Sequence, residues 1–343
     1  MSRTGIVRCA MAAVLFGLSA PAASQLTDDM GAFTLAGLLY LGAAIAVLPF
    51  LGRTPPSRQA VRTSLPKLSV AVVLGGAVGP VFLAAGLGLV PAATSSLLLN
   101  LELVFTILIA GLIFREHLGR HIIAGTALVM VGSIVLSWSG SPDLRWGALF
   151  IAAACVCWAI DNSVTAALDQ LSPSHITFAK GIIAGGANLA IGLSTTVAPS
   201  TGPILWALVI GAFGYGASIT LWVSGARDLG AARAQLVFAT APFVGAFAAW
   251  TILNEPVLPR ELIAFLIAAS GVAFVLGSDH EHDHRHEPLS HTHDHEIDEH
   301  HDHGHTGYLS STAHGGRHAH EHTHIRAVHE HPHVPDLHHR HDH

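Results

Sequence analysis

The sequence predicts an all-α membrane protein with ten transmembrane helices in two inverted five-helix repeats, followed by a disordered, His-rich C-terminal tail. Three observations support this prediction: the apolar composition of residues 1–277, the regular spacing of their apolar runs, and the concentration of histidine in residues 278–343. The 343 residues are 51% apolar and only 12% charged. Of the 26 histidines, 23 lie at or after His280. The two parts are therefore different kinds of polymer.

Residues 1–277 have the composition of a membrane protein. They carry 13 Lys and Arg and 10 Asp and Glu, far below the roughly one quarter of charged residues in a soluble domain. Their apolar runs of about 18 to 24 residues match the roughly 20 that a helix needs to cross a bilayer. The runs lack the alternation of membrane barrel strands, so helices are expected. The expected spans are 6–26, 31–51, 67–89, 91–114, 121–138, 145–167, 174–197, 203–225, 230–252 and 260–277.

The distribution of Lys and Arg predicts the orientation of the chain. With ten spans, the N-terminus and the even-numbered loops hold ten basic residues, whereas the opposite side holds only Arg145 and Arg260. Basic residues are enriched on the cytoplasmic side of a membrane. We therefore expect a multi-pass protein of the inner (plasma) membrane with both termini, and hence the tail, in the cytoplasm.

The first span has a second interpretation. The stretch "MSRTGIVRCAMAAVLFGLSAPAAS" has the basic start, apolar centre and small residues of a cleavable signal peptide. Cleavage would leave nine spans and would break the symmetry of the repeat. It would not move the tail across the membrane.

An internal repeat relates residues 1–139 to residues 140–277. At an offset of 139 residues, the sequence aligns Gly75 with Gly214, Gly86 with Gly225, Ala92 and Ala93 with Ala231 and Ala232, Glu116 with Glu255, and Gly132 with Gly271. Each half holds five expected spans. Because five is odd, the second half enters the bilayer upside down, an arrangement suited to alternating access in transporters.

Two stretches resemble a known family. "NLELVFTILIAGLIFREHLGRHIIAGTALVMVGSIVL" (100–136) and "FATAPFVGAFAAWTILNEPVLPRELIAFLIAASGVAFVL" (238–276) are each similar to the closing half of an EamA repeat of the drug/metabolite transporter superfamily. The shared pattern is an apolar helix, a Glu at its end, a short turn and a Gly-bearing helix. The likeness covers about residues 8–277 and implies ten helices and transport of a small solute.

The first stretch departs from the family pattern at one position that bears on the fold. Leu103 stands where the family commonly has Pro, and where Pro242 stands in the second stretch. A helix break in the first half therefore stays open. The resemblance places Glu116 and Glu255 at helix ends beside a turn, whereas the sequence alone only places both at a membrane surface.

Glu102 is the first of three charged residues expected inside the bilayer. Inserting a charged side chain at the bilayer centre costs about 2.5 to 3.5 kcal/mol, so such a group is expected to face protein or a water-filled cavity. Ser96 and Asn100 precede it on the same expected helix. In one interpretation, the Glu102 carboxyl binds and releases a proton during transport. In the other, it is a protonated acid that hydrogen-bonds to a neighbouring helix. The sequence leaves both open.

Asp161 and Lys180 are the other two charged residues expected inside the bilayer. They flank the turn "LDQLSPS", each about six or seven residues, or roughly 10 Å, from it. An antiparallel hairpin would bring them to one level, which favours an ion pair over a role in lining a cavity. Asn162 and Trp158 add a polar and an aromatic side chain to the same region.

The tail is predicted to bind divalent transition metal. Neutral imidazole is a good ligand for Zn²⁺, Ni²⁺, Co²⁺ and Cu²⁺, and the tail contains fourteen His-x-His triplets. Too few large apolar groups are present to form a core, so disorder is expected without metal. The alternative is a tail that only increases solubility and binds metal incidentally. The candidate ligands are His280, His282, His284, His286, His291, His293, His295, His301, His303 and His305.

These observations together predict a transporter that moves a small solute by alternating access, with a metal-binding tail. A transition-metal transporter of the same fold is the first alternative, although His117, His121 and His175 all fall near membrane surfaces. A membrane-anchored metal buffer or sensor is the second. No enzyme site, required cofactor or nucleic-acid surface is expected. The expected partners are the solute, the metal and the lipid bilayer, with a homodimer left open.

Overall fold

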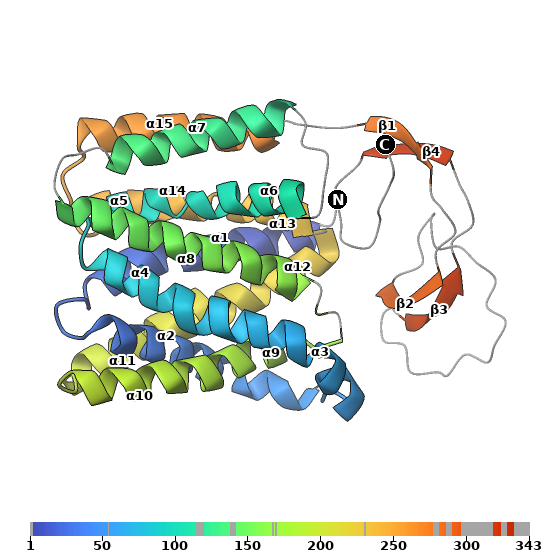
Figure 1. Cartoon of the computed structure of the whole chain (residues 1–343), viewed down its shortest axis with the longest axis horizontal. Helices are drawn as coiled ribbons and strands as arrows, with labels where there is room; N and C mark the ends of the chain where they lie inside the picture. Colours follow the sequence, from blue (N-terminus) through green and yellow to red (C-terminus); the bar gives the residue numbers. More distant parts are fainter. Residues whose placement is uncertain are drawn as a thin grey trace. The chain divides into compact units, whose positions relative to one another are not determined.

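In the computed structural model, the described residues are 3–53, 55–113, 120–137, 142–166, 168, 170–229 and 231–276, together with four segments of the tail. The helices and the strands belong to two separate compact units. The described part of the first unit is entirely helical (Figure 1). Seven of its helices are long and apolar enough to cross a membrane.

Each of the ten ranges predicted to span the membrane contains helix. The first half consists of α1 (Arg3–Ser24), α2 (Ala32–Val47), η1 (Leu48–Arg53), α3 (Arg58–Val70), η2 (Ala71–Val78), α4 (Gly79–Leu87), α5 (Ala92–Leu98), α6 (Leu101–Ile113) and α7 (Arg120–Ser137). The second half consists of α8 (Pro142–Ala166), α9 (Pro173–Ala179), η3 (Lys180–Gly185), α10 (Gly186–Thr195), α11 (Thr201–Ile210), η4 (Gly211–Ala217), α12 (Ser218–Leu229), α13 (Ala231–Phe238), α14 (Ala241–Thr251) and α15 (Pro259–Leu276).

Three long helices contain a π-helical segment in their middle: η2 joins α3 to α4, η3 joins α9 to α10, and η4 joins α11 to α12. Such segments widen the helix and are frequent at functional sites. Glycine makes close packing possible around them. At Gly181 in η3, an added Cβ would lie 2.5 Å from the carbonyl oxygen of Tyr40 in α2. At Gly211 in η4, it would overlap with the carbonyl of Leu39. Helix α2 is therefore held against both π-helical segments.

Several packed helix pairs correspond through the repeat. Helix α4 packs against α8, and α12 packs against α1; likewise α6 packs against α8, and α14 against α1. Helices α7 and α15, which are equivalent in the two halves, lie side by side (Figure 1). Each of these pairs joins residues before 139 to residues after 140. The two halves consequently share one core rather than forming separate domains.

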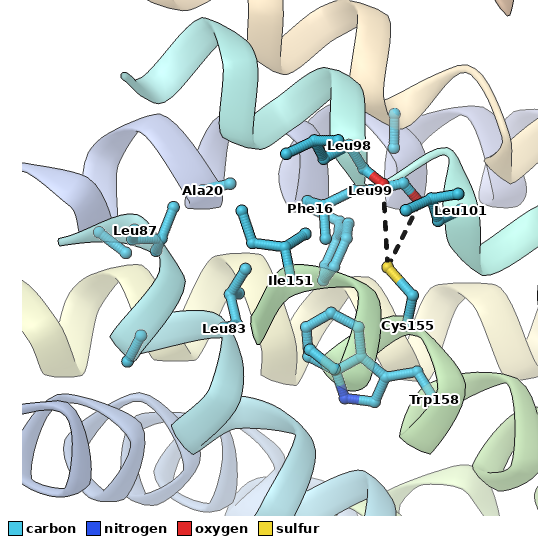
Figure 2. Packing of buried hydrophobic residues seen from close by; sticks show 14 of the residues in the cluster. Phe16, Ala20, Leu83, Leu87, Leu98, Leu99, Leu101, Ile151, Cys155 and Trp158 are labelled. Atoms are coloured by element: carbon cyan, nitrogen blue, oxygen red, sulfur yellow. Dashed lines mark hydrogen bonds between the residues drawn. The ribbon is translucent and has the colours of Figure 1, made fainter. Parts of the chain in front are cut away.

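A helix break is present in both halves. In the first half the sequence had left it undecided, because Leu103 stands where the family commonly has proline. Helix α5 ends at Leu98 and α6 begins at Leu101, while α13 ends at Phe238 and α14 begins at Ala241. The first break forms although Leu103 replaces proline. Side chains supply donors to the carbonyl groups there: Asn100 Nδ2 donates to Leu97 O at 3.0 Å, and Cys155 Sγ lies 4.0 and 3.9 Å from Leu98 O and Leu99 O (Figure 2).

The tail contains regular structure in four short segments. Strand β1 (Glu281–Arg285) pairs with β4 (Val328–Pro332), and β2 (Ser290–His295) with β3 (His318–Thr323), both antiparallel. This differs from the disorder that the composition predicted. An alternating sequence can adopt an extended chain, and pairing satisfies backbone donors and acceptors without an apolar core.

The candidate metal ligands divide between these strands and residues outside the described part. His282 and His284 are register partners of His331 and His329. His291, His293 and His295 are register partners of His322, His320 and His318. The remaining candidates, His280, His286, His301, His303 and His305, lie outside the described residues.

Candidate functional site

A cavity in the helical unit brings together side chains from both halves of the chain. The space between its lining atoms, open solvent included, is about 540 Å³. Five of the seven candidate cavity residues line it, whereas Ser96 and Asn100 are not among its lining residues. The lining residues are Phe16, Tyr40, Glu102, Trp158, Asp161, Asn162, Thr165, Lys180, Tyr215, Ser218, Ile219, Trp222, Val223, Gln235 and Phe238.

Glu102 reaches the cavity because it lies in the first turn of α6, immediately after the helix break. The residue is 7% exposed. Its Oε1 accepts a hydrogen bond from Asn162 Nδ2 at 2.7 Å and a long one from Gln235 Nε2 at 3.5 Å. Among the residues that the structure describes, no ion pair joins Glu102 to a basic side chain. The predicted hydrogen bond to a neighbouring helix is present, and the carboxyl also faces the cavity.

Asp161 and Lys180 form the ion pair that their equal depth predicted. Lys180 Nζ lies 2.6 Å from both carboxylate oxygens of Asp161. Thr165 Oγ1 donates to Asp161 Oδ1 at 3.0 Å, and Lys180 Nζ lies 3.4 Å from the same hydroxyl. Both charged side chains are buried. Both residues also line the cavity, so the two interpretations, an ion pair and a cavity-lining position, apply at the same time.

Gly75 makes room for this ion pair and supplies a polar backbone group. An added Cβ at Gly75 would overlap with the carboxylate of Asp161. The amide of Gly79 donates to Leu74 O, and Pro80 has no amide hydrogen, so neither can donate to the carbonyl of Gly75. That carbonyl instead accepts from Tyr40 Oη at 2.5 Å and Trp158 Nε1 at 3.2 Å.

Aromatic rings form much of the remaining wall. Phe16 lies at the centre, with ring-centroid distances of 5.9 Å to Trp158, 5.8 Å to Tyr215 and 5.3 Å to Phe238. Trp222 contacts Phe238 at 6.4 Å. These distances are typical of edge-to-face and tilted aromatic pairs. The cavity is thus polar on the side of α8 and largely aromatic elsewhere.

Sequence reasoning missed several lining residues, of which Gln235 is the one that a sequence signal could have identified. The offset of 139 places Gln235 at the position of Ser96, so the repeat puts a polar residue there in both halves. Tyr40, Tyr215 and Trp222 lie in apolar runs, where nothing distinguishes a lining ring from a packing ring.

Ser96 and Asn100 have other surroundings. Ser96 is buried in α5, where an added Cβ at Gly245 of α14 would lie 2.7 Å from its Oγ. Asn100 lies at the break between α5 and α6, where its amide caps a backbone carbonyl. Their proximity to Glu102 in sequence does not bring them into the cavity, because the break redirects the chain.

The start of α5 is held by acids from the other half of the chain. Glu255 accepts from the backbone amides of Ala92 at 2.8 Å and Ala93 at 2.9 Å. Glu261, 1% exposed, accepts from Thr94 Oγ1 at 2.7 Å and from Trp250 Nε1 at 3.3 Å. A carboxylate at a helix N-terminus satisfies amides that have no partner within the helix. We call this group the Glu255 clamp.

The cavity lies toward the opposite end of the helices from the Glu255 clamp. Val90, just before α5, packs close to Gly147 near the start of α8, whereas the lining residues of α8 run from Trp158 to Thr165 near its end. At that end, Arg8 of α1 pairs with Asp228 of α12 at 2.5 Å. The cavity described here therefore lies nearer the Arg8 end of the helices than the Glu255 clamp.

No group of three or more His, Cys, Asp or Glu side chains in the described part of the chain is arranged to hold a metal ion. The acids of the cavity are engaged with amide or ammonium donors, and those of the Glu255 clamp with backbone and side-chain donors. The chemistry available in the cavity is hydrogen bonding, charge pairing and aromatic contact.

Comparisons with known proteins agree with this architecture. The model of the EamA-like transporter family matches residues 3–138 and again residues 145–277. An uncharacterised transporter of Methanothermobacter thermautotrophicus is 27% identical over 300 residues, covering 79% of this chain and 85% of that protein. A probable amino-acid metabolite efflux pump of Salmonella typhimurium is 28% identical over 183 residues, covering 50% of this chain and 57% of its own.

A solved crystal structure shows the same fold. It aligns with a TM-score of 0.59 at 18% identity and covers 80% of this chain and 98% of its own length. The family match spans most of the chain in two consecutive copies, and seven described helices suit a bilayer. The chain is thus a multi-pass membrane protein that belongs to the EamA-like transporter family.

Proposed function

We propose that the chain moves a small organic solute across the inner membrane by alternating access, through ten helices in two inverted five-helix repeats. The observation that carries this proposal is the cavity, which is lined from both halves, contains three charged side chains and lies toward one end of the helices. Charged side chains within membrane helices are rare and mark solute or ion pathways. The name of the Salmonella relative supports an amino-acid-derived metabolite as the solute class.

The Glu255 clamp is the proposed gate on the closed side. The repeat aligns Glu255 with Glu116, and Ala92 and Ala93 with Ala231 and Ala232 at the start of α13. An equivalent cap at α13 would close the Arg8 end in the opposite state. We propose that alternating access exchanges one cap for the other. Glu116 itself lies outside the described residues.

Glu102 is the proposed coupling residue. It is buried, faces the cavity and accepts hydrogen bonds from α8 and α13, two helices that come from the second half. A carboxyl in this position can alternate between a proton and a solute group as its surroundings change. Asp161 and Lys180 are proposed to line the pathway as a neutral pair.

The tail is proposed to bind Zn²⁺, Ni²⁺, Co²⁺ or Cu²⁺ in the cytosol. Its His-x-His triplets support this role, and the positive-inside bias supports the location. Transport of the metal itself is the alternative that these histidines favour, and a metal buffer or sensor that transports nothing is the other.

Flux measurements test these possibilities. Purified protein in proteoliposomes, loaded with a labelled mixture of amino acids and amino-acid-derived amines, should move solute, and a variant that ends at Ser278 should move it equally well. Solute flux without metal flux in both proteins supports the proposal. Zn²⁺ or Ni²⁺ flux that survives the truncation would favour the metal transporter. Metal binding with no flux would favour the buffer.

A further inference from the structure

We propose that the cavity selects small amines with an apolar or aromatic body and discriminates against the corresponding amino acids and carboxylic acids. This inference rests on the proposed transport function and narrows its substrate class. Three features of the cavity carry it: its balance of charge, its unused hydrogen-bond acceptors and its aromatic wall.

The lining residues contain two carboxyl groups, Glu102 and Asp161, and one ammonium group, Lys180. Lys180 is committed to Asp161 through both carboxylate oxygens at 2.6 Å. With both acids ionised, the cavity has an excess of one negative charge, located at Glu102. A ligand carboxylate would meet no uncommitted cation among the described lining residues, whereas a ligand ammonium would meet an uncommitted carboxylate.

The hydrogen-bonding groups near Glu102 point to the same ligand. Only Oε1 of Glu102 accepts hydrogen bonds from described residues, and both come from amides. The Oε1 atom of Gln235 is buried and has no partner among those residues. An ammonium has three N–H donors and no acceptor, so it complements two underused acceptors. Buried polar atoms without a protein partner are expected where a ligand supplies the missing bond.

Aromatic faces provide the rest of the environment. Phe16, with Trp158, Tyr215 and Phe238 around it, forms an apolar surface beside the charged groups. Such rings pack against an aromatic ligand body and attract cations through their negatively charged faces. The indole N–H of Trp222 has no partner in the described part of the chain, and it suits a hydroxyl or carbonyl oxygen on the same ligand.

Three probes of similar body and different charge test the inference. Binding of 2-phenylethylamine, phenylalanine and 3-phenylpropionate to the full-length protein in nanodiscs is measured by calorimetry. We expect the amine to bind at least about 10-fold more tightly than either of the others, because only it lacks a carboxylate to desolvate. Glu102→Gln should weaken amine binding at least about 10-fold, since the amide keeps the shape and loses the charge.

Two further variants make the experiment decisive. Asp143→Asn removes an exposed acid at the start of α8 and should change none of the affinities. The double variant Asp161→Asn with Lys180→Met removes two lining charges and can lower all three affinities, but the amine should still bind most tightly of the three probes because Glu102 is retained. Thermal unfolding of each variant shows that it is folded.

The outcomes separate this inference from the transport proposal. Phenylalanine or phenylpropionate binding as tightly as the amine would overturn the inference, as would unchanged amine affinity in folded Glu102→Gln protein. Absence of binding by all three probes would also overturn it. In each of these cases, flux of another solute from the loaded mixture would leave the transport proposal standing.

Discussion

The carboxylate of Glu255 accepts a hydrogen bond from the backbone amide of Ala92 at 2.8 Å, although 163 positions separate them in the chain. Its second oxygen binds the next amide, that of Ala93. A connection in the second half thereby fixes the first turn of a helix in the first half. This contact, at one end of the helices, is the one proposed as a gate, and none of its three residues lines the cavity.

We predict that Glu255→Ala opens this end. Losing a helix cap costs about 0.5 to 2 kcal/mol, enough to increase the open population several-fold. In a background without the three native cysteines, the rate at which a membrane-impermeant maleimide modifies Ser95→Cys should rise by that factor. Ser95 is fully buried near the clamp, so the unmodified clamp should protect it. An unchanged rate would show that the contact is not a gate.

The Asp161–Lys180 pair should be more sensitive to the loss of one partner than to the loss of both. Asp161→Asn or Lys180→Met leaves a buried charge uncompensated, which costs about 3 to 5 kcal/mol. The double variant removes both charges and should be clearly more stable than either single one. Thermal unfolding in detergent gives the order of the melting temperatures. A double variant less stable than both single variants would contradict a simple ion pair.

Gly75→Ala should disturb the same pair through space. The new methyl group would overlap with the Asp161 carboxylate and must displace it from Lys180. Gly186→Ala is the matched control, because a Cβ there has no other heavy atom within 4 Å. We expect a marked loss of solute flux and a lower melting temperature for Gly75→Ala only. Equal behaviour of the two variants would show that the overlap is relieved at little cost.

Glu102→Gln should separate solute exchange from proton coupling. The amide can keep accepting from Asn162, but it cannot release a proton. Gln235 and Asp161 are the other polar or charged groups close to Glu102, and neither of their side chains is changed. Flux driven by an imposed pH gradient should be lost, whereas solute exchange at equal pH should continue once the solute concentration is raised to offset the weaker binding. Gradient-driven flux that survives would assign coupling to another residue.

Removal of residues 279–343 should abolish the tight binding of Ni²⁺ and Zn²⁺ and leave solute flux intact. The described helical unit lacks a three-ligand cluster, so the remaining metal affinity should be weak. Calorimetric titration of the full-length and truncated proteins measures the difference. Metal binding of equal strength in both would locate the ligands in the helical unit.

The membrane class, the helical structure and the family could be predicted from the sequence, because they depend on local hydrophobicity and on motifs along the chain. Cavity residues were partly predictable for a different reason. Burying a charge is costly, so Glu102, Asp161 and Lys180 stand out in an apolar run wherever they end up in space.

Only the tertiary structure decided which neutral residues join those charges. Ser96 and Asn100 precede Glu102 on the expected helix, yet the break after α5 keeps their side chains out of the cavity. Gln235, which is 133 positions from Glu102 in the chain, hydrogen-bonds to Glu102 and lines the cavity. The break forms without proline, and a carbonyl in η2 becomes available because Pro80 lacks an amide hydrogen. Local composition sets the cost of burying each group, but the partner that offsets this cost is chosen by packing between distant helices.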